Sequence, residues 1–154
     1  MAVRRSSVAA PALGRGDLDK AKALLRYGRY TLVLHRGDAI VASRTHGLRP
    51  LLDLCRPGAN YEGFVAADVV VGKAAALLYD SAGIDQVHAQ LISHHALEYF
   101  RKAGIAASWD NTCPAIMNRQ GTGLCPMEAL VNGVDNPVDA LSMLTKVLPA
   151  HSRI

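Results

Sequence analysis

Apolar and polar residues recur along this chain with two periods, which predict alternating helices and strands. In residues 17–27, apolar side chains return every three or four positions, which is the period of a helix. Residues 30–34 and 39–43 are short apolar runs on either side of the polar turn 35–38. Two such runs joined by a short turn predict a β-hairpin.

The rest of the pattern continues this alternation. We expect a short helix over residues 47–55, a buried helix entered near Asp68 and ending before Gly83, a strand over residues 87–92, a helix over residues 95–102, a strand over residues 105–109, a helix start at Pro126 and a last helix opened by Asn136. A hairpin followed by helices that alternate with strands predicts an α/β protein. The expected fold is a three-layer α/β/α sandwich with a mixed central sheet and crossover helices on both faces.

Length and composition favour one ordinary globular domain. The chain has 154 residues, of which 50% are hydrophobic and 19% are charged, so it has enough apolar material for a core. Residues 1–15 lack a clear pattern and are predicted to form a flexible arm, and residues 16–150 are predicted to form a single domain.

Charge and cysteine content narrow the function classes. The net charge of +4 is modest, and no dense basic stripe with interleaved aromatic residues appears, so nucleic-acid binding is not expected. The three cysteines are scattered, the N-terminal apolar run is too short for a secretory signal, and no apolar run approaches membrane-spanning length. We therefore expect a cytoplasmic protein with no membrane association.

The most specific stretch runs from Asn118 to Glu128 and reads Asn-Arg-Gln-Gly-Thr-Gly-Leu-Cys-Pro-Met-Glu. Pro126 suits the first position of a helix, which places Cys125 at the N-cap. Glu128 follows three residues later, the spacing of a capping box. A thiol at a helix N-terminus is favoured as thiolate, so Cys125 is a candidate nucleophile. The alternative is a small buried hydrophobe.

Several polar or glycine residues accompany Cys125 in an expected ligand pocket. Gly121 and Gly123 allow close backbone approach, and Arg119 and Asn118 offer donors to a ligand. Asn118 can instead cap a turn, and Arg119 can instead pair with Glu128.

Gly72 and Lys73 form a second candidate site, at a predicted helix start. Lysine beside the unpaired N–H groups of a helix start can bind a phosphate or carboxylate. The spacing does not fit a P-loop, because positions 67 and 74 are both alanine. The alternative is a glycine that permits close packing and a lysine that reaches solvent.

These segments resemble a prokaryotic family known as domain of unknown function 1893. The resemblance spans about residues 17–147 and is carried by Tyr30-Thr31-Leu32-Val33, Leu48-Arg49-Pro50-Leu51-Leu52, Val71-Gly72-Lys73-Ala74-Ala75-Ala76-Leu77-Leu78 and, most specifically, the Asn118–Glu128 stretch. It implies a cytidine deaminase-like fold and no assigned reaction.

The zinc motif of the deaminases is missing from the corresponding positions. Zinc deaminases place H-x-E or C-x-E at one helix start and P-C-x-x-C at the next. Here the first helix start, near Gly72, has no His, Cys or Glu, and His95 and Glu98 stand where the two thiolates would be. We therefore expect no cofactor and no zinc-dependent deamination. A metal bound by His95 and Glu98 remains a weaker alternative that requires a third ligand, such as His88 or Cys125.

Two functional hypotheses follow. The first is a protein with a pocket for a small anionic or nucleotide-like molecule, bound by Gly72, Lys73, Asn118, Arg119, Gly121, Gly123 and Glu128, with Cys125 as the catalytic residue if it is an enzyme. The second is a non-catalytic interaction or scaffold domain, including self-association as a homo-oligomer. The sequence does not decide whether the protein is an enzyme.

Overall fold

The helices and strands follow one another in a regular order over residues 12–148, the part of the chain that the computed structural model describes. In chain order they are α1 (Ala12–Tyr27), β1 (Leu32–Arg36), β2 (Ala39–Ser43), α2 (Arg49–Leu54), β3 (Val65–Val71), α3 (Lys73–Ala82), β4 (Gln86–Ser93), α4 (His94–Ala103), β5 (Ala106–Cys113), α5 (Pro126–Leu130) and α6 (Pro137–Val147).

The five strands form one mixed sheet in the order β2-β1-β3-β4-β5. β1 and β2 pair as an antiparallel hairpin with Leu34 opposite Val41, so the hairpin prediction is confirmed. β1 is also antiparallel to β3, whereas β3, β4 and β5 are parallel to one another. The prediction of an α/β protein with a mixed sheet is therefore confirmed.

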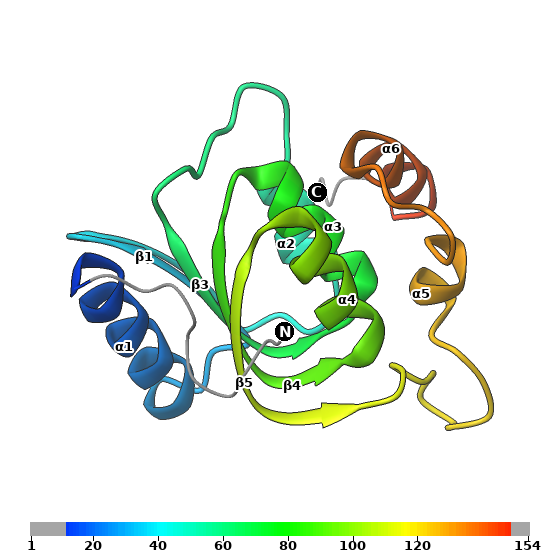
Figure 1. Cartoon of the computed structure of the whole chain (residues 1–154), viewed down its shortest axis with the longest axis horizontal. Coiled ribbons are helices and arrows are strands. Elements are labelled where there is room, and N and C mark those ends of the chain that lie inside the picture. Colours follow the sequence, from blue (N-terminus) through cyan, green and yellow to red (C-terminus); the bar gives the residue numbers. More distant parts are fainter. Residues whose placement is uncertain (1–11, 149–154) are drawn as a thin grey trace.

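Helices cover both faces of the sheet, but both crossover helices lie on the same face (Figure 1). Helices α3 and α4 join consecutive parallel strands in the same direction across the sheet, and right-handed crossovers then place both on one side. Helix α1 covers the other face, against β1, β3 and β4. The expectation of crossover helices on both faces is wrong, because the N-terminal helix supplies the second layer.

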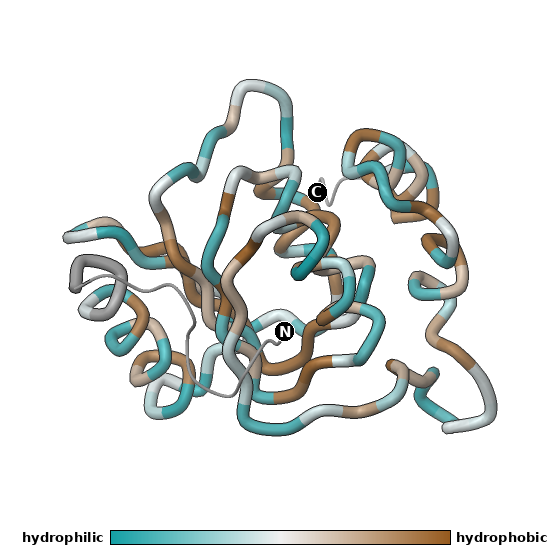
Figure 2. Tube along the Cα trace, viewed as in Figure 1, coloured by the Kyte–Doolittle hydropathy of each residue, from teal (hydrophilic) through white to brown (hydrophobic). Residues whose placement is uncertain are grey.

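Strand alternation divides the apolar residues between two cores. Leu32 and Leu34 face the larger core beneath α3 and α4, and Val33 between them faces the smaller core beneath α1. Figure 2 shows hydrophobic residues along the strands and on the inner sides of the helices. The two cores hold the sheet between two layers of helices.

Residues 65–71 form a strand, whereas the sequence predicted a buried helix entered near Asp68. The segment is rich in valine and lies between β1 and β4, and central strands read as continuous apolar runs that resemble buried helices. The helix begins only at Lys73, after Gly72. Asp68 therefore lies in the middle of a central strand and not at a helix start.

The N-terminal boundary of the predicted domain differs slightly from the structure. Helix α1 begins at Ala12, so the last residues of the predicted arm are helical, and residues 1–11 and 149–154 lie outside the described part of the chain. Among the helices between residues 12 and 148, none is long and apolar enough to cross a membrane.

Candidate functional site

A cavity of about 450 Å³ opens at the carboxyl end of β3, beside the start of α3. Its walls come from the end of the hairpin, from α2 and from the segment around α5, and they are largely apolar. The polar or reactive side chains at its surface are Thr31, Thr45, His46, Asp68, Arg119, Cys125 and Glu128. The carboxyl ends of strands are the usual ligand sites of open α/β sheets.

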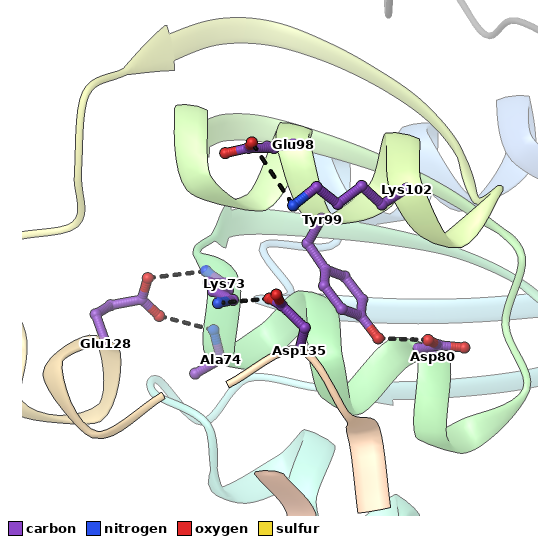
Figure 3. A network of polar contacts seen from close by, with 8 residues as sticks. All are labelled: Lys73, Ala74, Asp80, Glu98, Tyr99, Lys102, Glu128 and Asp135. Atoms are coloured by element: carbon purple, nitrogen blue, oxygen red, sulfur yellow. Dashed lines mark hydrogen bonds and ion pairs between the residues drawn. The ribbon is translucent and has the colours of Figure 1, made fainter. Parts of the chain in front are cut away.

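The start of α3 is closed by a carboxylate from the same chain (Figure 3). The backbone N–H of Lys73 donates to Glu128 Oε1 at 2.8 Å, and that of Ala74 donates to Oε2 at 2.9 Å. Glu128 is only 7% exposed, and a Cβ on Gly72 would lie 2.6 Å from its carboxylate. A glycine at position 72 is therefore required by the close approach of Glu128.

This arrangement corrects the predicted capping box. The N–H of Cys125 donates to the carbonyl of Ile116 at 2.9 Å and is not bound by Glu128. Glu128 caps α3 instead, a helix that lies more than 50 residues earlier in the chain. The helix dipole and the free N–H groups that were expected to receive an anionic ligand already hold an anion from the protein.

Lys73 is directed away from the large cavity. Its Nζ forms a 2.9 Å ion pair with Asp135, and this ammonium lowers the pKa of that carboxyl (Figure 3). Lys73 lines a much smaller cavity with His95 and Glu98. The side chain of Lys73 therefore lies outside the large cavity, which is lined by Gly72, Arg119 and Cys125.

The Asn118–Gly123 part of the predicted site forms a closed loop. Asn118 Oδ1 accepts the N–H of Thr122 at 3.0 Å, so the alternative role of Asn118 as a turn cap is confirmed. Gly121 has a φ of +71°, which glycine adopts without strain. Of these residues only Arg119, which is exposed, reaches the large cavity, and it forms no ion pair with Glu128.

Asp68 is a candidate functional residue that the sequence reasoning missed. Its carboxyl lines the cavity and accepts a 2.5 Å hydrogen bond from the hydroxyl of the buried Tyr79. Burial raises the pKa of Asp68 to about 6, and the Tyr79 hydroxyl opposes this shift in part. A carboxyl that titrates near neutral pH inside a cavity is typical of binding and catalytic sites. The sequence analysis missed Asp68 because it placed this residue at the start of a helix and not in a strand.

His94 and His95 are not placed to act as a base for Cys125. Both are exposed at the start of α4, whose N-cap is Ser93, and neither lines the cavity of Cys125. His46 does line it. Within residues 12–148 no group of three or more His, Cys, Asp or Glu side chains is placed to hold a metal ion, so His95 and Glu98 have no third ligand there.

Cys55 and Trp109 have structural surroundings. The Cys55 thiol donates to the carbonyl of Leu78 at 3.4 Å, and burial raises its pKa to about 11. Burial also raises the pKa of Cys113. Trp109 is buried in the larger core.

Comparison with known proteins gives a family and similar solved structures. The model of the family described as "Domain of unknown function (DUF1893)" matches residues 20–148. The crystal structure of a DUF1893 family protein from Thermotoga maritima matches with a TM-score of 0.80 and 29% sequence identity, over 86% of this chain and 90% of that one. No match was found among curated proteins.

Proposed function

The chain belongs to the family described as domain of unknown function 1893, and we propose that it binds a small, nucleotide-like molecule in the cavity at the carboxyl end of β3. The observation that carries the proposal is the Asp68 carboxyl, with a pKa near 6, in a cavity of about 450 Å³ with mostly apolar walls. Cavities of this size and composition are typical of small-molecule sites.

Each part of such a ligand has a matching group. The apolar walls suit a flat heterocycle, and Asp68 suits the hydrogen-bonding edge of that ring, because a carboxyl accepts when ionised and also donates when protonated. Arg119 at the surface of the cavity suits a phosphate or carboxylate. We place the anionic group at Arg119 and not at the start of α3, because Glu128 occupies that position.

The proposal includes a cytidine deaminase-like fold without zinc chemistry. The unit β3-α3-β4-α4-β5 beside an antiparallel hairpin is compatible with that fold. The start of α3 carries Gly72 and Lys73 where a deaminase carries a metal ligand and a general base, so no cofactor is proposed here.

Cys125 supports a second candidate function, that of a cysteine-dependent enzyme. It lines the same cavity as His46, and a nucleophilic thiol requires a base nearby. Alkylation by iodoacetamide at pH 7, mapped by mass spectrometry, tests this role, with Cys55 and Cys113 as internal controls. An enzyme role predicts that Cys125 reacts at least tenfold faster than either. Equal rates would exclude Cys125 as an activated nucleophile.

The binding proposal is tested with native mass spectrometry and thermal shift. The purified protein is titrated with a panel of nucleoside monophosphates, beside Asp68→Asn, Arg119→Gln and the control Arg101→Gln, which removes an exposed cation of α4 outside the cavity. We expect saturable binding that both cavity variants weaken at least tenfold and the control leaves unchanged.

Failure of the whole panel to bind would overturn this proposal. It would favour the alternative of a non-catalytic interaction domain, which sedimentation of the untreated protein would then examine for self-association.

A further inference from the structure

A second cavity, of about 260 Å³, lies on the opposite face of the sheet, between α1 and the strands β4 and β5. No residue lines both this cavity and the one at the end of β3. Lys22 and Arg26 reach it from α1, His88 and Gln90 from β4, and Asp110 from β5.

The strands that form this cavity are polar where a core would be apolar. Side chains of β4 and β5 alternate, so Val87, Ala89 and Ala107 enter the larger core while His88 and Ser108 face the side of α1. His88 is 3% exposed and Ser108 is 2% exposed. Apolar residues would pack as well as His88 and Ser108 at these buried positions, because the burial of polar groups is unfavourable unless they are hydrogen-bonded.

His88 is held in one orientation by two neighbours on β5. Its Nδ1 is hydrogen-bonded to Ser108 Oγ at 2.7 Å, and its Nε2 lies 3.4 Å from Asp110 Oδ1. Ser108 does not line the cavity, so its role is to orient the imidazole. The imidazole is therefore held in a fixed orientation in the floor of the cavity.

Two cations, Lys22 and Arg26, line the cavity beside this floor. Lys22 and Arg26 are four residues apart and thus share one face of α1. Among residues 12–148 neither has a carboxylate partner within ion-pair distance. Burial and these two cations lower the pKa of His88, while Asp110 acts in the opposite direction. Two cations and one carboxylate leave the cavity with a net positive charge.

We propose that this cavity is a binding site for a small carboxylate or phosphate anion, held by Lys22 and Arg26 above the oriented imidazole of His88. Arginine offers a planar fork that matches both anions, and lysine adds a mobile donor beside it. The anion neutralises the excess positive charge that Lys22 and Arg26 leave in the cavity beside Asp110. The modest volume limits the ligand to a small molecule such as inorganic phosphate or a short dicarboxylate.

The test is isothermal titration of the full chain with inorganic phosphate and, separately, with succinate, at constant ionic strength. The double variant Lys22→Gln/Arg26→Gln is compared with the control Lys20→Gln/Arg29→Gln, which removes the same charge from exposed residues that do not line the cavity. All four positions are at least partly exposed, so folding is retained.

We expect one saturable site for at least one of the two anions. The cavity variant should weaken its affinity at least tenfold and the control less than twofold, and the His88 imidazole resonances should shift only when the ligand binds. No saturable binding of either anion, or an equal loss in both double variants, would overturn the proposal. Loss in Arg119→Gln together with full binding in Lys22→Gln/Arg26→Gln would place the anion in the other cavity and likewise overturn it.

Discussion

At the scale of single residues, Asp68 carries the clearest pH dependence. Its folded pKa is about 6, above the ordinary value of 3.8, because burial disfavours the charged form. The folded protein therefore binds more protons than the unfolded chain between these values, and the free energy of unfolding falls as pH rises from about 4 to 6. A pKa shift of roughly two units on this half-buried carboxyl changes the free energy of unfolding by about 2 kcal/mol.

The measurement is urea unfolding of the wild type and Asp68→Asn at several pH values from 4 to 7. The amide keeps an oxygen that accepts a hydrogen bond from the Tyr79 hydroxyl, but it does not titrate. The unfolding free energy of the variant should therefore increase relative to that of the wild type as pH rises. Asp38→Asn, at an exposed turn, provides the control and should follow the wild type. A constant difference between wild type and Asp68→Asn across this range would contradict the raised pKa.

At the scale of elements, the junction of α3 with α5 depends on the absence of a side chain at position 72. In Gly72→Ala the new methyl group would lie 2.6 Å from the Glu128 carboxylate, which is buried and has little room to move. The two N–H groups of α3 would lose their acceptor, and an unsatisfied buried donor costs about 1–3 kcal/mol. We expect Gly72→Ala to lower the unfolding free energy by about 2–4 kcal/mol in chemical denaturation.

The matched control is Gly16→Ala in α1, where nothing lies within 4 Å of the new methyl group. Alanine there should be neutral or stabilising by up to about 1 kcal/mol, because glycine is the poorer helix former. Similar destabilisation by both substitutions would indicate that helix propensity, and not the contact with Glu128, determines the effect.

The same junction shows how far local sequence reasoning reaches. The hairpin and the starts of α5 and α6 were predictable, because turns and prolines act within a few residues. The capping of α3 by Glu128 was not, because the two partners are 55 residues apart and meet only through the fold. The apolar run of β3 was misread for a related reason, since a fully buried strand and a buried helix share one pattern.

At the scale of the whole molecule, the sheet separates the two cavities. One opens on the side of α3 at the end of β3, and the other on the side of α1 over β4 and β5. The strands between them are packed on both faces, and a close-packed core of this kind does not deform continuously. Energetic coupling between the two cavities requires a structural element with two alternative arrangements. Substitutions at distant sites without shared partners usually have additive effects on stability.

We therefore expect the cavities to act independently. Lys22→Gln/Arg26→Gln should leave the iodoacetamide rate of Cys125 unchanged within twofold, and Asp68→Asn should leave phosphate and succinate titrations unchanged. The quadruple combination of these substitutions with Arg119→Gln should show a loss of unfolding free energy equal to the sum of the separate losses, within about 0.5 kcal/mol. A larger deviation, or protection of Cys125 by an anion that requires Lys22 and Arg26, would mean that the sheet transmits binding from one face to the other. Helix α1, which packs on β1, β3 and β4, would then be the element whose position both cavities share.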